Sequence, residues 1–140
     1  MSLTRRKLMV AGSSVLALSA ITGSPLFASI VDDHINAFTG GADLASGSIM
    51  LDTPEIAENG NTVPIEVSAP GATSIMLLAA GNPVPAVATF NFGPLSGARS
   101  GSTRIRLAKS QDVIAIAKMN DGSYEMASAM VKVTIGGCGG

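Results

Sequence analysis

The chain has one cysteine, one histidine and no tryptophan among its 140 residues. The single cysteine, Cys138, excludes an intramolecular disulfide. The single histidine, His34, excludes a metal site built from several histidines, and we interpret it as a surface residue of a helix. Because the aromatic residues are only four phenylalanines and one tyrosine, the core must consist mainly of Val, Ile, Leu, Ala and Met.

The usual enzyme motifs are also missing from the sequence. No Ser-His-Asp set can be argued, because His34 belongs to the N-terminal part of the chain. No Gly-x-Gly-x-x-Gly or phosphate-binding loop follows a predicted strand, and no basic run indicates nucleic acid. Glu55 and Glu58 could form an acid pair on one helical face, but a solvated loop explains them equally well. We therefore expect neither a cofactor nor a metal site.

Residues 1–28 have the pattern of a cleavable export signal. A charged segment with twin arginines, Thr4–Leu8, precedes an apolar stretch to Ile21, and Ser24-Pro25 breaks this stretch before a possible cleavage site after Ala28. The pattern resembles a bacterial twin-arginine signal, whose route exports folded proteins, often with a partner. We therefore expect a periplasmic protein with no membrane attachment after cleavage. An uncleaved membrane anchor is the alternative, although the apolar stretch is short for a membrane span.

Cleavage would leave 112 residues, enough for one domain, which we place at residues 29–135. Arg5, Arg6 and Lys7 would be lost, so six basic and ten acidic residues would give a net charge of −4. Ile30, Ile35 and Phe38 share one face of a predicted short helix over 30–38, which Thr39-Gly40-Gly41 ends.

From Ser48 onward, alternating apolar residues and turn residues predict about seven short strands. This pattern predicts an all-β fold, an immunoglobulin-like antiparallel β-sandwich with a short N-terminal helix. In the last strand Val131 and Val133 lie on one face while Met126 and Met130 lie on the other, so the helix or a partner sheet is expected to cover the outer face. The predicted strands are Ser48–Leu51, Thr62–Ser68, Ser74–Ala80, Ala86–Phe92, Ser102–Leu107, Asp112–Met119 and Tyr124–Ile135.

The chain ends in a lone thiol between two pairs of glycines: Gly136, Gly137, Cys138, Gly139 and Gly140. Glycine has no Cβ, so residues 136–140 are predicted to form a flexible arm, about 17 Å long when extended. A frayed tail with an accidental cysteine is the alternative. In an oxidising compartment, however, a single thiol must be buried, capped, bridged or in use. No neighbouring side chain can lower its pKa, so Cys138 is predicted to be a covalent attachment point for partner enzymes and not a catalytic nucleophile.

The ending Val131–Gly140 resembles the C-terminus of the SoxY family, the sulfur-carrier subunits of the bacterial thiosulfate-oxidising Sox complex. Pro54–Gly60, Thr103–Ala108 and Asn82-Pro83 followed by Val87–Phe90 resemble the family too, so the resemblance spans nearly all of the mature chain. It implies an immunoglobulin-like sandwich that pairs with a SoxZ-like subunit as a heterodimer.

The resemblance also implies a role for the terminal motif. A c-type cytochrome would join thiosulfate oxidatively to Cys138, a hydrolase would release sulfate and leave a persulfide, and in some organisms a sulfane dehydrogenase would oxidise the remaining sulfur. Gly136, Gly137, Gly139 and Gly140 would give the arm the slimness and mobility that let the adduct enter narrow active sites.

Two other functions fit the residues. Gly139-Gly140 permits a carrier of the ubiquitin-like kind, activated at the carboxylate of Gly140, although the export signal argues against cytosolic activating enzymes. An exported interaction module whose Cys138 forms an intermolecular disulfide is the other alternative.

Overall fold

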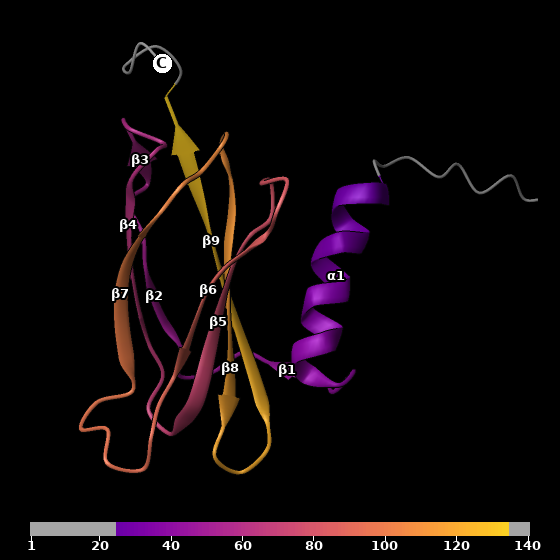
Figure 1. Cartoon of the computed structure of the whole chain (residues 1–140), viewed down its shortest axis with the longest axis vertical. Helices are drawn as coiled ribbons and strands as arrows, with labels where there is room; N and C mark the ends of the chain where they lie inside the picture. Colours follow the sequence, from indigo (N-terminus) through magenta and orange to yellow (C-terminus); the bar gives the residue numbers. More distant parts are fainter. Residues whose placement is uncertain (1–24, 135–140) are drawn as a thin grey trace, which may run out of the picture.

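The computed structural model describes residues 25–134, with side chains from Ile30 onward. In this range the chain forms one helix, α1 (Pro25–Thr39), followed by nine strands (Figure 1). The strands are β1 (Leu44–Ala45), β2 (Met50–Asp52), β3 (Ile56–Ala57), β4 (Val63–Ser68), β5 (Ala72–Ala79), β6 (Ala86–Asn91), β7 (Ser100–Ile105), β8 (Gln111–Met119) and β9 (Tyr124–Val133).

The strands between residues 25 and 134 form two sheets that face each other as a sandwich. One sheet has the order β1-β9-β8-β5-β6, with β3 also paired to β9, and the other has the order β2-β4-β7. The long strands pair antiparallel, whereas the two-residue strands β1 and β3 each pair parallel with β9. Figure 1 shows α1 beside the larger sheet, with β3 and the described end of β9 at the same end of the sandwich. The predicted immunoglobulin-like β-sandwich is confirmed.

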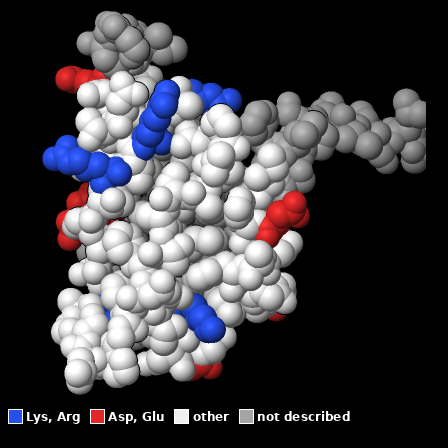
Figure 2. All heavy atoms as spheres, viewed as in Figure 1, with Lys and Arg blue, Asp and Glu red and all other residues white. Residues whose placement is uncertain are grey.

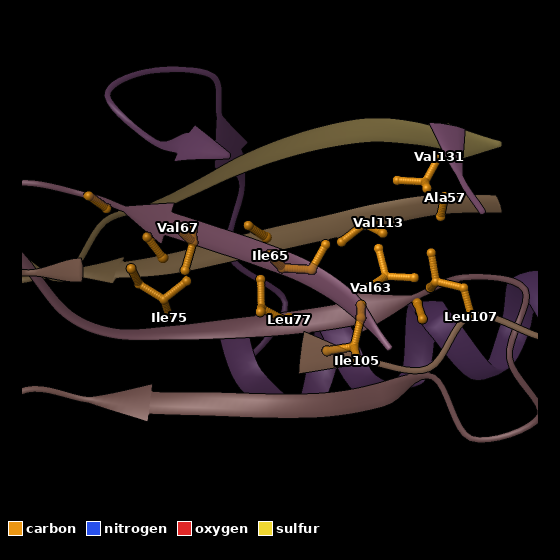
Figure 3. Packing of buried hydrophobic residues seen from close by; sticks show 14 of the residues in the cluster. Ala57, Val63, Ile65, Val67, Ile75, Leu77, Ile105, Leu107, Val113 and Val131 are labelled. Atoms are coloured by element: carbon orange, nitrogen blue, oxygen red, sulfur yellow. The ribbon is translucent and has the colours of Figure 1, made fainter. Parts of the chain in front are cut away.

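The core between the sheets comes from the period-two alternation of the strands. Val63, Ile65 and Val67 of β4 are at most 2% exposed and point toward β5 and β8 of the opposite sheet. From that sheet, β5 contributes Ile75 and Leu77, and β8 contributes Val113 (Figure 3). As predicted from composition, the buried residues of this cluster within the described range are all Val, Ile, Leu or Ala.

A second, smaller cluster lies between α1 and the outer face of the larger sheet. Val31 of α1 packs with Met76, Leu78 and Ile116, and Ile35 and Phe38 border them. These sheet residues alternate with the core residues of β5 and β8, so both strands are buried on both faces. This packing explains why Ser74–Ala80 reads as an almost continuous apolar run.

The helix is longer than predicted, since it begins at Pro25 instead of Ile30. Proline is well suited to the first turn of a helix, where its missing N–H has no intrahelical acceptor, so Pro25 begins α1. No helix within residues 25–134 is long and apolar enough to cross a membrane. All seven predicted strands are present within a few residues, but the sequence analysis missed β1 and β3.

The outer face of β9 is only partly covered by α1. Phe38 reaches Tyr124 at the start of β9, but Met126 and Met130 remain 36% and 61% exposed. The prediction that Val131 and Val133 lie on one face of β9 and Met126 and Met130 on the other is confirmed as far as Thr134, and Val131 is fully buried on the inner face. Ile135 lies outside the described residues.

Candidate functional site

Cys138 and its flanking glycines, Gly136, Gly137, Gly139 and Gly140, lie outside the described residues. The predicted signal also lies outside them, except for residues 25–28, which belong to α1. What the structure describes is the strand end that leads to the cysteine. Thr134 is the last described residue, and Cys138 follows it by four positions.

The end of β9 is held along both edges. On one edge the backbone N–H of Lys132 donates to the carbonyl of Glu55 (2.9 Å), and that of Thr134 donates to the carbonyl of Ala57 (3.1 Å). The ladder with β8 on the other edge ends at the pair Gln111 and Val131. Two residues further on, the N–H of Val133 donates to Oγ of Ser110 (2.8 Å), so a side chain replaces the missing strand partner.

The loop that carries Ser110 is itself fixed by a buried polar network. Oδ1 of Asn82 accepts from the backbone N–H of Ala108 (3.0 Å) and from Nε2 of Gln111 (2.9 Å), while its Nδ2 donates to the carbonyl of Arg106 (2.7 Å). Oε1 of Gln111 in turn accepts from the N–H of Gly81 (2.8 Å). Asn82 and Gln111 are both buried, and no buried side-chain polar atom in the described range lacks a partner. The network ties the turn between β5 and β6 to residues 106–111.

Gly60 lets this loop lie close to the end of β9. The N–H of Leu107 donates to the carbonyl of Gly60 (2.7 Å). A Cβ at Gly60 would lie 2.7 Å from the carbonyl oxygen of Leu107 and 3.0 Å from Cγ1 of Val133. These separations leave no room for a side chain, so the close approach requires glycine.

Basic side chains gather at this end of the sandwich. Of the six lysines and arginines within residues 25–134, Arg104 and Arg106 lie at the end of β7, Lys109 in the next loop and Lys132 near the end of β9. Figure 2 shows Lys and Arg side chains toward the end at which β9 finishes. A hollow of about 300 Å³ lies at the same end and is lined by Asn82, Pro83, Val84, Arg106 and Ala108.

The other sequence candidates form no reactive group. Glu55 and Glu58 lie in bends on either side of β3, so they do not share a helical face. His34 lies on α1 and is half-buried, so it is less exposed than the surface position expected for it. Within residues 25–134 no three or more His, Asp or Glu side chains gather as a metal site. Ser110, Asn82 and Gln111 were not identified as functional from the sequence, because their contacts join residues 23 to 29 positions apart.

The fold and this strand end define a class of protein: a β-sandwich whose last strand leads directly into a cysteine-bearing tail. The family model described as "Sulfur oxidation protein SoxY" matches residues 35–138, a range that ends at the cysteine. The sulfur carrier protein SoxY from Chlorobium limicola f. thiosulfatophilum is 37% identical, over 77% of this chain and 99% of that one, with a TM-score of 0.68. The chain therefore belongs to the SoxY family, as the terminal motif predicted.

More distant structures share the fold alone. A superoxide reductase (neelaredoxin) from Ignicoccus hospitalis is 20% identical over 64% of this chain and 82% of its own, with a TM-score of 0.56. A putative superoxide reductase from Thermotoga maritima is 18% identical over 70% and 91% of the two chains, with a TM-score of 0.52. The comparison with curated proteins found no significant match.

Proposed function

We propose that the chain is a periplasmic, covalent carrier of sulfur intermediates in thiosulfate oxidation. The substrate is tethered through the thiol of Cys138 and passed between partner enzymes on the arm formed by residues 136–140. The observation that carries this proposal is the family match, which extends through the whole last strand to Cys138. The fixed end of β9 supports it, because an arm that delivers a substrate needs a firm base.

The proposed chemistry takes place on one sulfur atom. The thiol of Cys138 and thiosulfate join through a new S–S bond, releasing one proton and two electrons, which a c-type cytochrome accepts. Water then attacks the terminal sulfone in a hydrolase, sulfate and a proton leave, and a persulfide remains on Cys138. Where a sulfane dehydrogenase is present, it oxidises the outer sulfur of the persulfide to a sulfonate with three water molecules, releasing seven protons and six electrons, which a c-type cytochrome accepts. Hydrolysis of this sulfonate releases sulfate and a proton and restores the thiol of Cys138. The chain supplies the attachment point, and the partners supply the catalysis.

The anionic adduct would be carried near basic side chains. Arg104, Arg106, Lys109 and Lys132 lie toward the end of the sandwich at which β9 finishes, although Glu55 and Glu58 lie there too. A SoxZ-like subunit is the proposed heterodimer partner. The exposed side chains of Met126 and Met130 on β9 provide apolar surface beside α1, as expected for a protein that binds others.

We also propose that residues 1–28 are an export signal and that residues 29–135 form the mature domain. Cleavage after Ala28 would fall inside α1 and remove its first four residues. Among the helix residues whose side chains the structure describes, 30–39, Val31, Ile35 and Phe38 pack against the sheet, and all three lie beyond the cleavage point. The processed protein would therefore keep these three contacts.

The test is the intact mass of the exported protein, before and after reductant, with peptide mapping. We expect a reductant-labile gain of sulfur or thiosulfate on the peptide that contains Cys138. Cys138→Ser should fold normally and carry no adduct, whereas Ser128→Ala, an exposed control on β9, should load normally. Normal loading of Cys138→Ser would overturn the proposal. A disulfide-linked dimer with no sulfur adduct would favour the interaction module, and an adduct on Gly140 the ubiquitin-like carrier.

A further inference from the structure

Ser110 contacts the last part of β9 on the edge where pairing with β8 has ended. In the regular strand, odd-numbered residues of β9 direct their backbone groups toward β8, and even-numbered ones toward β3. Beyond the pair Gln111 and Val131 the β8 side has no strand partner. Oγ of Ser110 takes this place: it accepts from the N–H of Val133 at 2.8 Å and lies 3.4 Å from the carbonyl oxygen of Val133, to which it donates.

We propose that Ser110 is a positioning residue that fixes the point at which the carrier arm leaves the sandwich. The inference rests on the proposed function only in taking Cys138 as the cargo site. With Ser110 in place, Val133 is held on the β8 side and its neighbours Lys132 and Thr134 on the β3 side. Four residue steps separate Thr134, the last described residue, from Cys138.

The loop that carries Ser110 is built to hold that position. Leu107 is hydrogen-bonded to Gly60, and Ala108 is hydrogen-bonded to Asn82. Gln111 is hydrogen-bonded to both Asn82 and Gly81. Ser110 itself is exposed, and its hydroxyl makes no hydrogen bond other than those to Val133 within the described residues. Other residues hold this loop in place, and the hydroxyl of Ser110 bonds only to Val133 within the described residues. We therefore infer that this hydroxyl stabilises the end of β9 and not the loop.

The two hydrogen bonds between Ser110 and Val133 limit the length of the proposed arm. Without the bonds of Ser110, the backbone hydrogen bonds that hold β9 beyond Val131 within residues 25–134 are those to Glu55 and Ala57 at β3, and a strand end held on one edge opens more readily. If the strand frays back to Val131, the tether to Cys138 grows from four residue steps to seven. The r.m.s. span of a glycine-rich chain grows roughly as the square root of its length, so the span would increase by about a third. The effective concentration of the cargo at a docked partner would fall about twofold.

The experiment measures the arm without any sulfur compound or partner. Nitroxide labels on Cys138 and on Ser128→Cys, a reference position on β9, report the distance distribution between the strand and the tip of the arm by pulsed EPR. Amide hydrogen exchange of Val133 and Leu77 is followed in the same variants. The variants are Ser110→Ala, Ser110→Thr, which keeps a hydroxyl, and Ser102→Ala, an exposed serine control on β7.

In Ser110→Ala we expect Val133 to exchange about five- to tenfold faster and the distance distribution to broaden by up to about a third. Ser110→Thr should restore both, Ser102→Ala should change neither, and exchange at Leu77 in the core should stay constant. Unchanged exchange at Val133 would overturn the proposal, as would an unchanged distance distribution or equally faster exchange at Leu77. A carrier that fails to load sulfur on Cys138 would refute the proposed function and leave these measurements intact.

Discussion

The ring of Phe38 in α1 stands nearly edge-on to the ring of Tyr124 in β9, with centroids 6.0 Å apart and planes at 73°. This contact joins the helix to the first residue of the strand whose other end leads to Cys138. Val31 and Ile35 place the rest of the helix over β5 and β8. The helix α1 therefore packs against the start of β9, as well as against β5 and β8, on the face of the larger sheet away from the core.

The Phe38–Tyr124 pair should contribute a measurable coupling energy. Edge-to-face aromatic pairs are worth about 0.5–1.5 kcal/mol beyond the area they bury. We expect this coupling in a double-mutant cycle of Phe38→Leu and Tyr124→Leu, measured by urea unfolding. A cycle of Phe38→Leu with Leu95→Ala is the control, because Leu95 is 98% exposed in a distant loop. Equal coupling in both cycles would show that the ring contact has no specific role.

Gly60→Ala should destabilise the fold by about 1–3 kcal/mol, since the new methyl group would overlap the carbonyl oxygen of Leu107. Gly97→Ala is the matched control, because a Cβ there meets no atom within 4 Å. Its effect on the free energy of unfolding should stay within about 0.5 kcal/mol. Chemical denaturation of the two variants checks the difference, and equal effects would contradict the close approach at Gly60.

Asn82→Ala should cost about 1–3 kcal/mol, because it leaves the N–H of Ala108, the carbonyl of Arg106 and Nε2 of Gln111 with fewer partners. Asn91→Ala on the exposed edge strand β6 is the comparison and should be nearly neutral. The melting temperatures of both variants measure the difference in stability. An unchanged melting temperature of Asn82→Ala would mean that water replaces the lost hydrogen bonds with no cost in stability.

The carboxylate of Asp121, in the turn between β8 and β9, accepts from the hydroxyl (2.6 Å) and the backbone N–H (2.9 Å) of Ser123. These bonds favour the charged form and lower the pKa of Asp121. Their contribution is present above the ordinary pKa of aspartate and is lost as the pH falls through the lowered value. An NMR titration should show the lowered pKa, and Ser123→Ala should move it back toward the ordinary value. The same pKa in both proteins would contradict this assignment.

Gly137→Val should slow the transfer of sulfur from the loaded carrier to a partner hydrolase while leaving the melting temperature unchanged. The reason is that a β-branched side chain adds bulk and χ1 stiffness to the proposed arm, outside the predicted domain of residues 29–135. The rate of sulfur transfer from the loaded protein to the hydrolase would be measured in timed, quenched reactions, with Gly97→Ala as a stability-matched control. Transfer at the unaltered rate would show that the arm needs no slimness at this position.

Most of the fold could be predicted because its pattern is local. Val63, Ile65 and Val67 alternate with the exposed residues 64 and 66, and all three are buried as the period of a strand requires. Asn120-Asp121-Gly122, a sequence typical of hairpin turns, lies between the two longest strands, β8 and β9. The strands β1 and β3 were missed because two residues carry no periodicity, and each exists only through its parallel pairing with β9.

The sequence by itself determined the all-β class, the order of the long strands along the chain and the position of the only thiol, because composition, alternation and a terminal motif are properties of neighbouring residues. Only the tertiary structure decided how the strand before that thiol is held. Ser110 meets Val133, and Asn82 meets Gln111, across 23 and 29 positions of the chain. Such contacts depend on how β5, β8 and β9 pack together, and no local pattern encodes the hydrogen-bond partner of an isolated serine or asparagine.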